Sequence, residues 1–364
     1  MGRLGISVYP EHSTPEQDFK YIKKAAECGF KRVFSCLISA EGDTDEIAAR
    51  YKKTNEYAQS FGMEVILDIA PPVFEKFGIE HTNLKPFLDM GANGIRLDED
   101  LPAQEEAMMT YNPYGLKVEI NASQATKHVD YVLSYGANQD KLISCHNFYP
   151  QKYTALSLEH FHKCNAIMKV QGIPVAAFVT SQNDNTFGPW PVNEGLCTVE
   201  MHRELPIDVQ ARHLLAMGEV DDIIIGNAFA TDEELEAMAA LTDGKLTFKL
   251  ETEEENWEVE DKIIYEFPHH VRGDMGDYMA RSTFSRITYA SEDIPPHNTR
   301  DLKRGDVVVL NNGYGRYKGE LHIVLRDMEN EGNKNVVGHI PAHESMLLEY
   351  LTPWRPFKIL KIDK

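Results

Sequence analysis

The chain has 364 residues, of which 42% are hydrophobic and 26% are charged, a globular composition with room for one large core and a smaller one. No run of residues approaches the roughly 18 consecutive apolar residues that a membrane-spanning helix needs. The net charge of −20 repels polyanions, so we expect neither nucleic acid nor an anionic membrane as a partner.

The sequence starts directly with strand-like residues and lacks the apolar core of a signal peptide. Its five cysteines are odd in number and widely spaced, and none forms a CxxC pair. Together these features predict a reduced, cytoplasmic protein. They leave the oligomeric state open.

Short β-branched runs alternate with longer amphipathic runs up to about residue 240. The predicted strands are 3–10, 31–39, 64–70, 94–98, 117–121, 141–148, 174–181 and 221–227. The helices predicted between them include 14–29, 43–62, 123–136 and 157–172, each of which begins with a capping residue and ends in glycine. This rhythm predicts a (β/α)8 TIM-type barrel over residues 1–243. The alternative is a doubly wound open sheet, but YPEHSTP follows the first strand where a glycine-rich phosphate loop would be expected.

The composition changes after residue 243. Strand-like runs at 245–252, 262–272, 278–289, 305–312, 319–327 and 335–341 are separated by turns and show little helical periodicity. We therefore predict a small all-β domain over residues 244–364, either a closed barrel or a sandwich. The acidic run 251–261 is expected to be a solvated hairpin or loop.

Alternate side chains of a barrel strand point inward and toward the helices, and the helix-facing set should be aliphatic. This rule predicts polar side chains inside the barrel near the carboxyl ends of five strands. They are Tyr9, Asp68, Arg96, Asp98, Glu119, Asn121 and His146, with Glu11 just beyond the first strand. A purely structural core would have aliphatic residues there, and catalytic residues of this fold lie at that face. These residues are therefore the candidate site.

Cleavage of a glycosidic bond requires two carboxylates around one cavity. One protonates the leaving oxygen, and the other acts as nucleophile or base. Asp98 and Glu119 are the leading candidates, without a choice of role between them, and Asp68 and Glu11 are held in reserve. The residues expected to bind or orient a sugar or phosphate are Tyr9, Arg96, Asn121 and His146.

Other interpretations stay open. Arg96 could form a purely structural ion pair with a neighbouring carboxylate. Asp68, Asp98 and His146 could bind a metal, but no HxH or HExxH spacing supports this, and we predict neither metal nor cofactor. A sugar-phosphate isomerase or aldolase would want an inward lysine at a strand end, whereas Lys117 begins its strand at the opposite end. A non-catalytic sugar-phosphate binding protein could use the same pocket.

Long loops follow the sixth and seventh strands at the same face of the predicted barrel. They are rich in Asn, Tyr, Trp and His, as sugar-binding loops are, because aromatic faces stack on sugar rings and amides bond hydroxyl groups. Their candidate binding residues are Asn147, Tyr149 and Glu194. A lid that makes no ligand contact is the alternative.

The predicted second domain gathers basic and aromatic residues in an otherwise acidic chain. Its candidates are Arg281, Arg286, Tyr314 and Arg316. Such a cluster suggests either a site for a phosphate or carboxylate group, or a surface that packs against the acidic first domain. In the first case these residues would close over the substrate.

Several segments together resemble the bacterial 6-phospho-N-acetylmuramidase family. They are LGISVYPE (4–11), GIRLD (94–98), EIN (119–121), NFYP (147–150), GPWPVNEGLCTVEMHR (188–203), RSTFSR (281–286), GYGRYKGE (313–320) and NVVGHI (335–340). The resemblance covers the whole chain and implies a (β/α)8 barrel followed by a cyclophilin-like β-barrel. It also implies cytosolic hydrolysis of the β-1,4 bond in N-acetylmuramic acid 6-phosphate–N-acetylglucosamine during peptidoglycan recycling. The partner would then be this small phosphorylated disaccharide.

Overall fold

The structure is a computed structural model that describes residues 2–241, 244–252 and 257–362. The chain divides into two compact units, Met1–Thr242 and Asp243–Lys364. Residue 243 of the predicted domain boundary and residues 253–256 of the acidic run lie outside the described residues. In the part of the chain that is described, no helix has the length and apolar character needed to cross a membrane.

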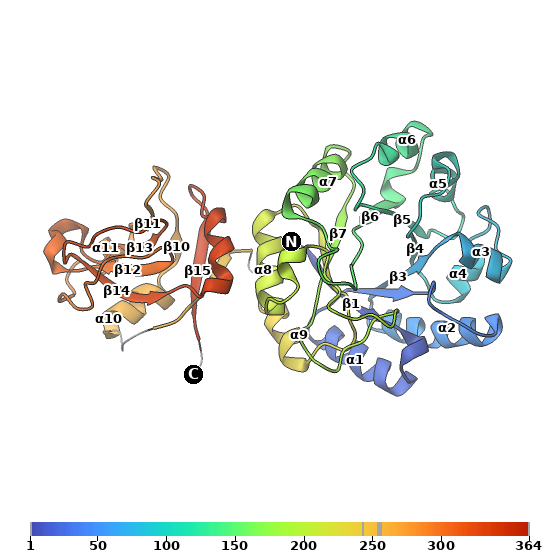
Figure 1. Ribbon diagram of the computed structural model, residues 1–364, viewed down its shortest axis with the longest axis horizontal. Helices are drawn as coiled ribbons and strands as arrows, with labels where there is room; N and C mark the ends of the chain where they lie inside the picture. Colours follow the sequence, from blue (N-terminus) through green and yellow to red (C-terminus); the bar gives the residue numbers. More distant parts are fainter. Residues whose placement is uncertain (1, 242–243, 253–256, 363–364) are drawn as a thin grey trace. The chain divides into compact units, whose positions relative to one another are not determined.

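The first unit is a closed barrel of eight parallel strands, in which each strand pairs with the next and β8 pairs with β1 (Figure 1). The strands are β1 (Arg3–Val8), β2 (Arg32–Cys36), β3 (Glu64–Ile69), β4 (Gly94–Leu97), β5 (Lys117–Asn121), β6 (Leu142–Cys145), β7 (Val175–Val179) and β8 (Asp222–Ile225). All eight fall inside predicted ranges, and the predicted (β/α)8 barrel is confirmed.

Helices surround this barrel (Figure 1). They are α1 (Pro15–Glu27), α2 (Thr44–Ser60), α3 (Pro71–Phe77), α4 (Lys85–Asp89), α5 (Ala103–Met109), α6 (His128–Ser134), α7 (Leu158–Val170), α8 (Ile207–Met217) and α9 (Asp232–Ala239), with short 3-10 turns η1 (Pro10–His12), η2 (Gln139–Lys141) and η3 (Glu200–His202). The side chains of Thr14, Asp43 and Ser157 cap α1, α2 and α7 as predicted. By contrast, α6 begins at His128, five residues after the predicted start at Ser123.

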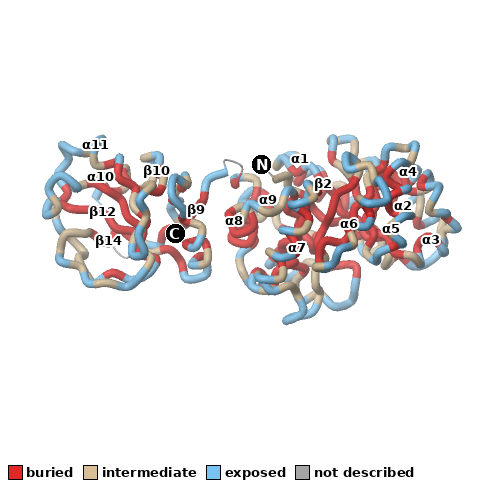
Figure 2. Tube along the Cα trace, turned by 90° about the horizontal axis from the view of Figure 1, so that it is seen from above, coloured by how far each residue is buried: buried red, intermediate tan, exposed pale blue. Residues whose placement is uncertain are grey.

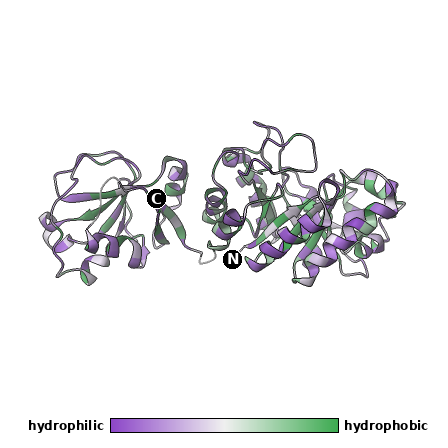
Figure 3. Cartoon of the chain, turned by 90° about the horizontal axis from the view of Figure 1, so that it is seen from below, coloured by the Kyte–Doolittle hydropathy of each residue, from purple (hydrophilic) through white to green (hydrophobic). Residues whose placement is uncertain are grey.

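The barrel strands are buried on both faces (Figure 2). Between strands and helices lie aliphatic side chains such as Ile6, Val65 and Ile223. A separate cluster fills part of the barrel interior, with Phe34 from β2 and Phe178 from β7 among its members. Figure 3 shows the corresponding division of hydropathy, with hydrophobic strands and helices that are largely hydrophilic on their outer faces. This packing leaves the carboxyl ends of the strands as the place for a site.

The described residues of the second unit form two sheets, with strand orders β10-β15-β9 and β11-β13-β12-β14. Its strands are β9 (Leu246–Leu250), β10 (His269–His270), β11 (Met279–Ser282), β12 (Asp306–Leu310), β13 (Leu321–Val324), β14 (Lys334–His339) and β15 (Pro356–Lys361). Its helical segments are α10 (Glu258–Asp261), η4 (Lys262–Glu266), α11 (Ser285–Thr288), η5 (Asn312–Tyr317) and η6 (Ala342–Tyr350). Two predicted strands, 262–272 and 278–289, are therefore partly helical, and β15 forms where no strand is predicted.

Candidate active site

A cleft opens at the carboxyl ends of the barrel strands, and about 430 Å³ of space lies within it and its open mouth. Its lining residues are Phe34, Ile38, Asp68, Arg96, Asp98, Asn147, Phe148, Pro150, Phe178 and Trp190. They come from β2, β3, β4 and β7 and from the segments that follow β2, β4, β6 and β7. The cleft thus brings together four of the predicted site residues, namely Asp68, Arg96, Asp98 and Asn147.

Arg96 joins two aspartates at one side of this cleft. Its Nη1 atom lies 2.5 Å from Asp68 Oδ1 and 2.9 Å from Asp98 Oδ1. The Asp68 side chain is 5% exposed, whereas that of Asp98 is 39% exposed. The two carboxylates therefore share one cation but differ in their access to solvent.

The buried position of Asp68 changes the acidity of its carboxyl group. Burial raises the pKa of Asp68 to about 6, an effect opposed by the positive charge of Arg96 and reinforced by the negative charge of Asp98. A carboxyl group with a pKa near 6 holds its proton more readily at neutral pH than an ordinary aspartate does. Such a group suits the role of a general acid.

The shared guanidinium nitrogen also limits how far apart the carboxylates lie. Their bonded oxygens cannot be farther apart than the sum of 2.5 Å and 2.9 Å, or about 5.4 Å. Retaining glycosidases have carboxyl groups about 5–5.5 Å apart, whereas inverting enzymes keep them about 6.5–9.5 Å apart to admit a water molecule. The pair is close enough for the retaining chemistry.

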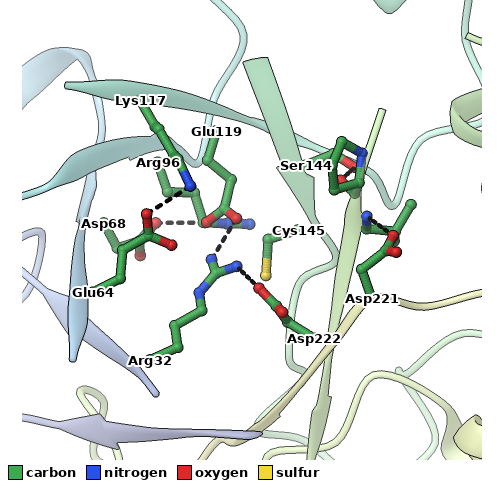
Figure 4. Close-up of polar contacts among 12 residues, drawn as sticks. Arg32, Glu64, Asp68, Arg96, Lys117, Glu119, Ser144, Cys145, Asp221 and Asp222 are labelled. Carbon is green, nitrogen blue, oxygen red and sulfur yellow. Dashed lines mark hydrogen bonds and ion pairs between the residues drawn. The ribbon is translucent and has the colours of Figure 1, made fainter. Parts of the chain in front are cut away.

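Glu119 points into the barrel as predicted and contacts Arg32 (Figure 4). It does not line the cleft. Arg32 donates one hydrogen bond to Glu119 and a second, of 2.8 Å, to Asp222. All three side chains are almost fully buried. Arg32 also packs against Gly5: a Cβ atom at position 5 would lie only 3.2 Å from the Cβ atom of Arg32, so the glycine leaves room for the arginine. Glu119 therefore belongs to a buried ion-pair network, and its assignment as a leading catalytic carboxylate gains no support from the geometry.

Glu11 and Tyr9 are also held away from the cleft. The carboxylate of Glu11 accepts hydrogen bonds from the hydroxyl groups of Ser39 and of Tyr51, the latter at 2.6 Å. Tyr9 is fully buried and donates its hydroxyl proton to the carbonyl oxygen of Gly226. Neither side chain lines the cleft, so both occupy structural positions.

The predicted inward orientation of His146 is wrong. Its Nε2 atom lies 2.9 Å from Asn165 Oδ1, and its ring lies 4.7 Å from that of Phe161; both partners belong to α7. Cys145, the preceding residue, belongs to the interior cluster instead. The register of β6 is thus the reverse of the predicted one, and the alternative metal set of Asp68, Asp98 and His146 is not brought together.

The three asparagine and tyrosine candidates have different environments. Asn147 lines the cleft and accepts a hydrogen bond from Arg96. Asn121 donates to the backbone carbonyl of Asp98 at 3.2 Å and so fixes the strand end that carries this carboxylate. Tyr149 is half-buried beside the cleft and does not line it. Glu194 lies in a separate polar pocket, where its carboxylate accepts the backbone N–H of Lys152 at 2.9 Å.

Trp190 lines the cleft and remains 41% exposed, but the sequence pattern does not single it out among the loop residues. It lies between two prolines in the segment after β7. Both ends of this segment are anchored, because Phe187 exchanges backbone hydrogen bonds of 2.6 and 2.9 Å with Ala228, and the Glu194 N–H donates to the carbonyl oxygen of Pro150 at 2.9 Å. The anchored segment therefore holds a partly exposed indole in the lining of the cleft.

One group of side chains outside the cleft has the spacing of a possible cation site within the described ranges. The ligand atoms of Asp100, Glu106 and His128 lie within 4.8 Å of one another. These groups already bond each other and the backbone: His128 Nε2 is 2.7 Å from Glu106 Oε2, and Glu106 Oε1 accepts the Leu101 N–H at 2.8 Å. The hydrogen bond to Glu106 raises the pKa of His128. The group thus ties the segment after β4 to α6.

The candidates of the second unit all contact neighbours within that unit. Arg281 on β11 donates to the backbone carbonyl of Asp274 at 2.9 Å. Arg286 pairs with Glu320 at 2.5 Å, and the guanidinium groups of Arg286 and Arg316 lie 5.4 and 4.8 Å from the ring centre of Tyr317. The ring of Tyr314 is covered by the ammonium group of Lys334 at 5.0 Å. Their role in substrate binding stays a prediction.

Two of the solved structures that resemble this chain extend over nearly its whole length. An uncharacterized protein from B. cereus is 45% identical, with a TM-score of 0.92, and covers 99% of this chain and 100% of its own. A conserved protein of unknown function from Enterococcus faecalis is 23% identical, with a TM-score of 0.76 over 99% of this chain and 96% of its own, and shows the fold alone. No protein of curated function matches.

Two family models match consecutive parts of the chain. The model described as 6-phospho-N-acetylmuramidase, N-terminal, matches residues 4–240, which include the barrel and its cleft. The model described as 6-phospho-N-acetylmuramidase, C-terminal, matches residues 246–360. The chain therefore belongs to the 6-phospho-N-acetylmuramidase family.

Proposed function

We propose that this protein is a glycosidase that hydrolyses the β-1,4 bond between N-acetylmuramic acid 6-phosphate and N-acetylglucosamine in the cytoplasmic recycling of peptidoglycan. Family membership supports the reaction class. The observation that carries the proposal is the pair Asp68 and Asp98, joined through Arg96 in the cleft, with the pKa of Asp68 raised to about 6. Two carboxylates perform this hydrolysis without a cofactor.

The two aspartates take different roles in the proposed mechanism. Asp68, in the molecules in which its buried carboxyl group carries a proton, donates that proton to the glycosidic oxygen as the bond to the leaving sugar breaks. Asp98, the more exposed carboxylate, attacks the anomeric carbon and forms a glycosyl-enzyme ester. The Asp68 carboxylate then accepts a proton from water, which displaces Asp98 and restores both groups. Arg96 stabilises the negative charge that remains on Asp68 between the two steps.

Asn147 and Trp190 are placed to hold the sugar around this pair. Asn147 lines the cleft and accepts a hydrogen bond from Arg96 through its side-chain oxygen, so we expect its amide N–H groups to donate to hydroxyl or carbonyl oxygens of the sugar. Trp190 offers the aromatic face on which the apolar side of a pyranose packs. The combination of carboxylates, one amide and an exposed indole is suited to a carbohydrate.

The direct test is incubation of the purified full-length protein with the phosphorylated disaccharide, followed by separation of the products. We expect stoichiometric release of N-acetylglucosamine and N-acetylmuramic acid 6-phosphate. Binding of the disaccharide without release would favour a non-catalytic sugar-phosphate binding protein. The position of Lys117 does not support an aldolase that uses a Schiff base, because this lysine pairs with Glu64 at 2.6 Å and does not line the cleft.

The activity of the protein should decline at alkaline pH. A general acid must carry its proton in the free enzyme, and the pKa of Asp68 is about 6, so kcat/KM should fall about tenfold per pH unit above that value. The measurement is a pH profile of kcat/KM from pH 4.5 to 8.5. An aryl glycoside with a strongly acidic leaving group, which departs without protonation, should lack this alkaline decline in bond cleavage. A flat profile to pH 8 for the disaccharide would contradict the role of Asp68.

A further inference from the structure

The cleft has one charged side and one aromatic side. The aromatic wall consists of Phe34 from β2, Phe178 from β7 and Phe148 after β6. Their rings pack edge to face, with centroid distances of 5.9 Å for Phe34–Phe148 and 5.1 Å for each ring with Phe178, and with interplanar angles of 83–87°. Such a closed triangle admits no sugar ring between its members. Phe34 and Phe178 are each only 1% exposed, so Phe148, which is partly buried, presents most of the accessible apolar surface to a small group beside it.

Apart from Trp190, whose indole carries one N–H donor, the aromatic and aliphatic residues in the described lining have no hydrogen-bonding side-chain group. The neighbouring lining residues Ile38 and Pro150 are apolar, whereas the polar lining groups gather on β3, on β4 and at Asn147. A sugar hydroxyl turned toward the aromatic wall would lose its hydrogen bonds to water without replacement, which is unfavourable. A methyl group in the same place would gain from leaving water. The wall therefore selects the substituent that faces it.

We infer that the aromatic wall receives the methyl group of the 2-acetamido substituent on the sugar whose anomeric bond is cleaved. The inference rests on the proposed glycosidase function. The bonded oxygens of Asp68 and Asp98 lie within about 5.4 Å of each other, so the anomeric carbon must lie beside both. Carbon 2 is its direct neighbour, and its substituent must fit in the same small cleft. The wall would thus distinguish N-acylated amino sugars from ordinary hexoses.

The test uses four aryl β-glycosides. Three are N-acylmuramic acid 6-phosphates that carry a formyl, acetyl or propionyl group, and the fourth is the N-acetyl compound with a hydroxyl in place of the lactyl ether. Wild-type protein should prefer acetyl over formyl by about tenfold in kcat/KM, the size of effect that one methyl contact in an apolar pocket gives. Phe148→Ala should reduce this preference to about twofold or less and make the propionyl compound the best substrate.

Phe148 is the position to change because it is only partly buried, whereas Phe34 and Phe178 belong to the barrel core. Phe148→Leu keeps the wall filled and should show an intermediate preference, which protects the test if the alanine variant unfolds. Phe187→Ala serves as the matched control, since Phe187 packs near Tyr9 but does not line the cleft. It should keep the wild-type acetyl-to-formyl ratio.

Three results would overturn the inference. One is an unchanged acetyl-to-formyl ratio in folded Phe148→Ala and Phe148→Leu, and a second is an equal change in Phe187→Ala. In the third, Phe148→Ala changes the kcat/KM ratio between the compounds with and without the lactyl ether but leaves the acetyl-to-formyl ratio unchanged. This result would assign the aromatic wall to the methyl group of the lactyl ether. If wild-type protein hydrolyses none of the four compounds, the proposed function itself fails. Hydrolysis without acyl discrimination contradicts the inference alone.

Discussion

Replacement of Asp98 by asparagine should lower kcat/KM for the phosphorylated disaccharide by more than about a thousandfold, because the amide cannot form the glycosyl-enzyme ester. The loss should be as large for an aryl glycoside with an acidic leaving group, since both substrates need the nucleophile. Asp68→Asn should differ. It should lose about 10²–10⁴-fold on the disaccharide but should still cleave the activated aryl glycoside in a rapid first turnover, followed by slow release of the sugar.

Steady-state and first-turnover kinetics of both variants provide this comparison, with circular dichroism to establish folding. Asp89→Asn is the matched control, because Asp89 is an exposed aspartate on α4 that pairs with Lys85. It should keep wild-type kinetics. If folded Asp98→Asn retained near-wild-type turnover, the nucleophile would have to be sought elsewhere. An equal loss on both substrates for Asp68→Asn would remove Asp68 from the role of acid.

Arg32→Ala should destabilise the protein by about 3–5 kcal/mol, because it leaves the buried carboxylate of Glu119 without its cation, whereas Asp222 keeps its pair with Arg3. Burial raises the pKa of Asp222, but the hydrogen bond from Arg3 and the charge of Arg32 outweigh it and lower that pKa overall. The ion-paired network therefore contributes stability at neutral pH, and this contribution is lost in acid as the pH falls through the lowered pKa of Asp222. Urea unfolding at pH 7 measures the cost.

The same experiment separates a structural Glu119 from a catalytic one. Lys85→Ala removes an exposed ion pair with Asp89 and should cost less than about 1 kcal/mol. Glu119→Gln should also lower stability, but the folded fraction should keep kcat within about tenfold of wild type. A loss of activity of a thousandfold or more in Glu119→Gln, with unchanged stability, would restore Glu119 as a catalytic carboxylate.

Alternation along the strands predicts which face a residue occupies but not its depth in the barrel. Arg96 on β4 and Glu119 on β5 are neighbours in the register of the two strands, and both side chains point inward as predicted. Yet Arg96 reaches toward the cleft, whereas Glu119 binds Arg32 in the buried network. Arg32 at the start of β2 is the feature of the sequence that indicates a structural role for Glu119, because a buried guanidinium group needs carboxylates beside it. The ranking of Glu119 above Asp68 overlooked this partner.

The register of β6 could not be read in the same way. In LISCHNF both alternate sets mix apolar and polar residues, so neither set is clearly the aliphatic one that faces the helices. The contacts of His146 with α7 depend on Asn165, which is distant in sequence. Trp190 is a further case, since its place at the cleft depends on how the segment after β7 is anchored to Ala228. Such long-range contacts are not contained in local periodicity.

The most direct measurement of the central claim is the anomeric form of the first sugar product. The phosphorylated disaccharide is hydrolysed by the full-length protein in the NMR tube, and the anomeric proton of N-acetylmuramic acid 6-phosphate is followed before mutarotation. A nucleophilic Asp98 within about 5.4 Å of the acid Asp68 predicts retention, so the β-anomer should form first and the α-anomer later. Initial formation of the α-anomer, or no cleavage by folded protein, would contradict the account.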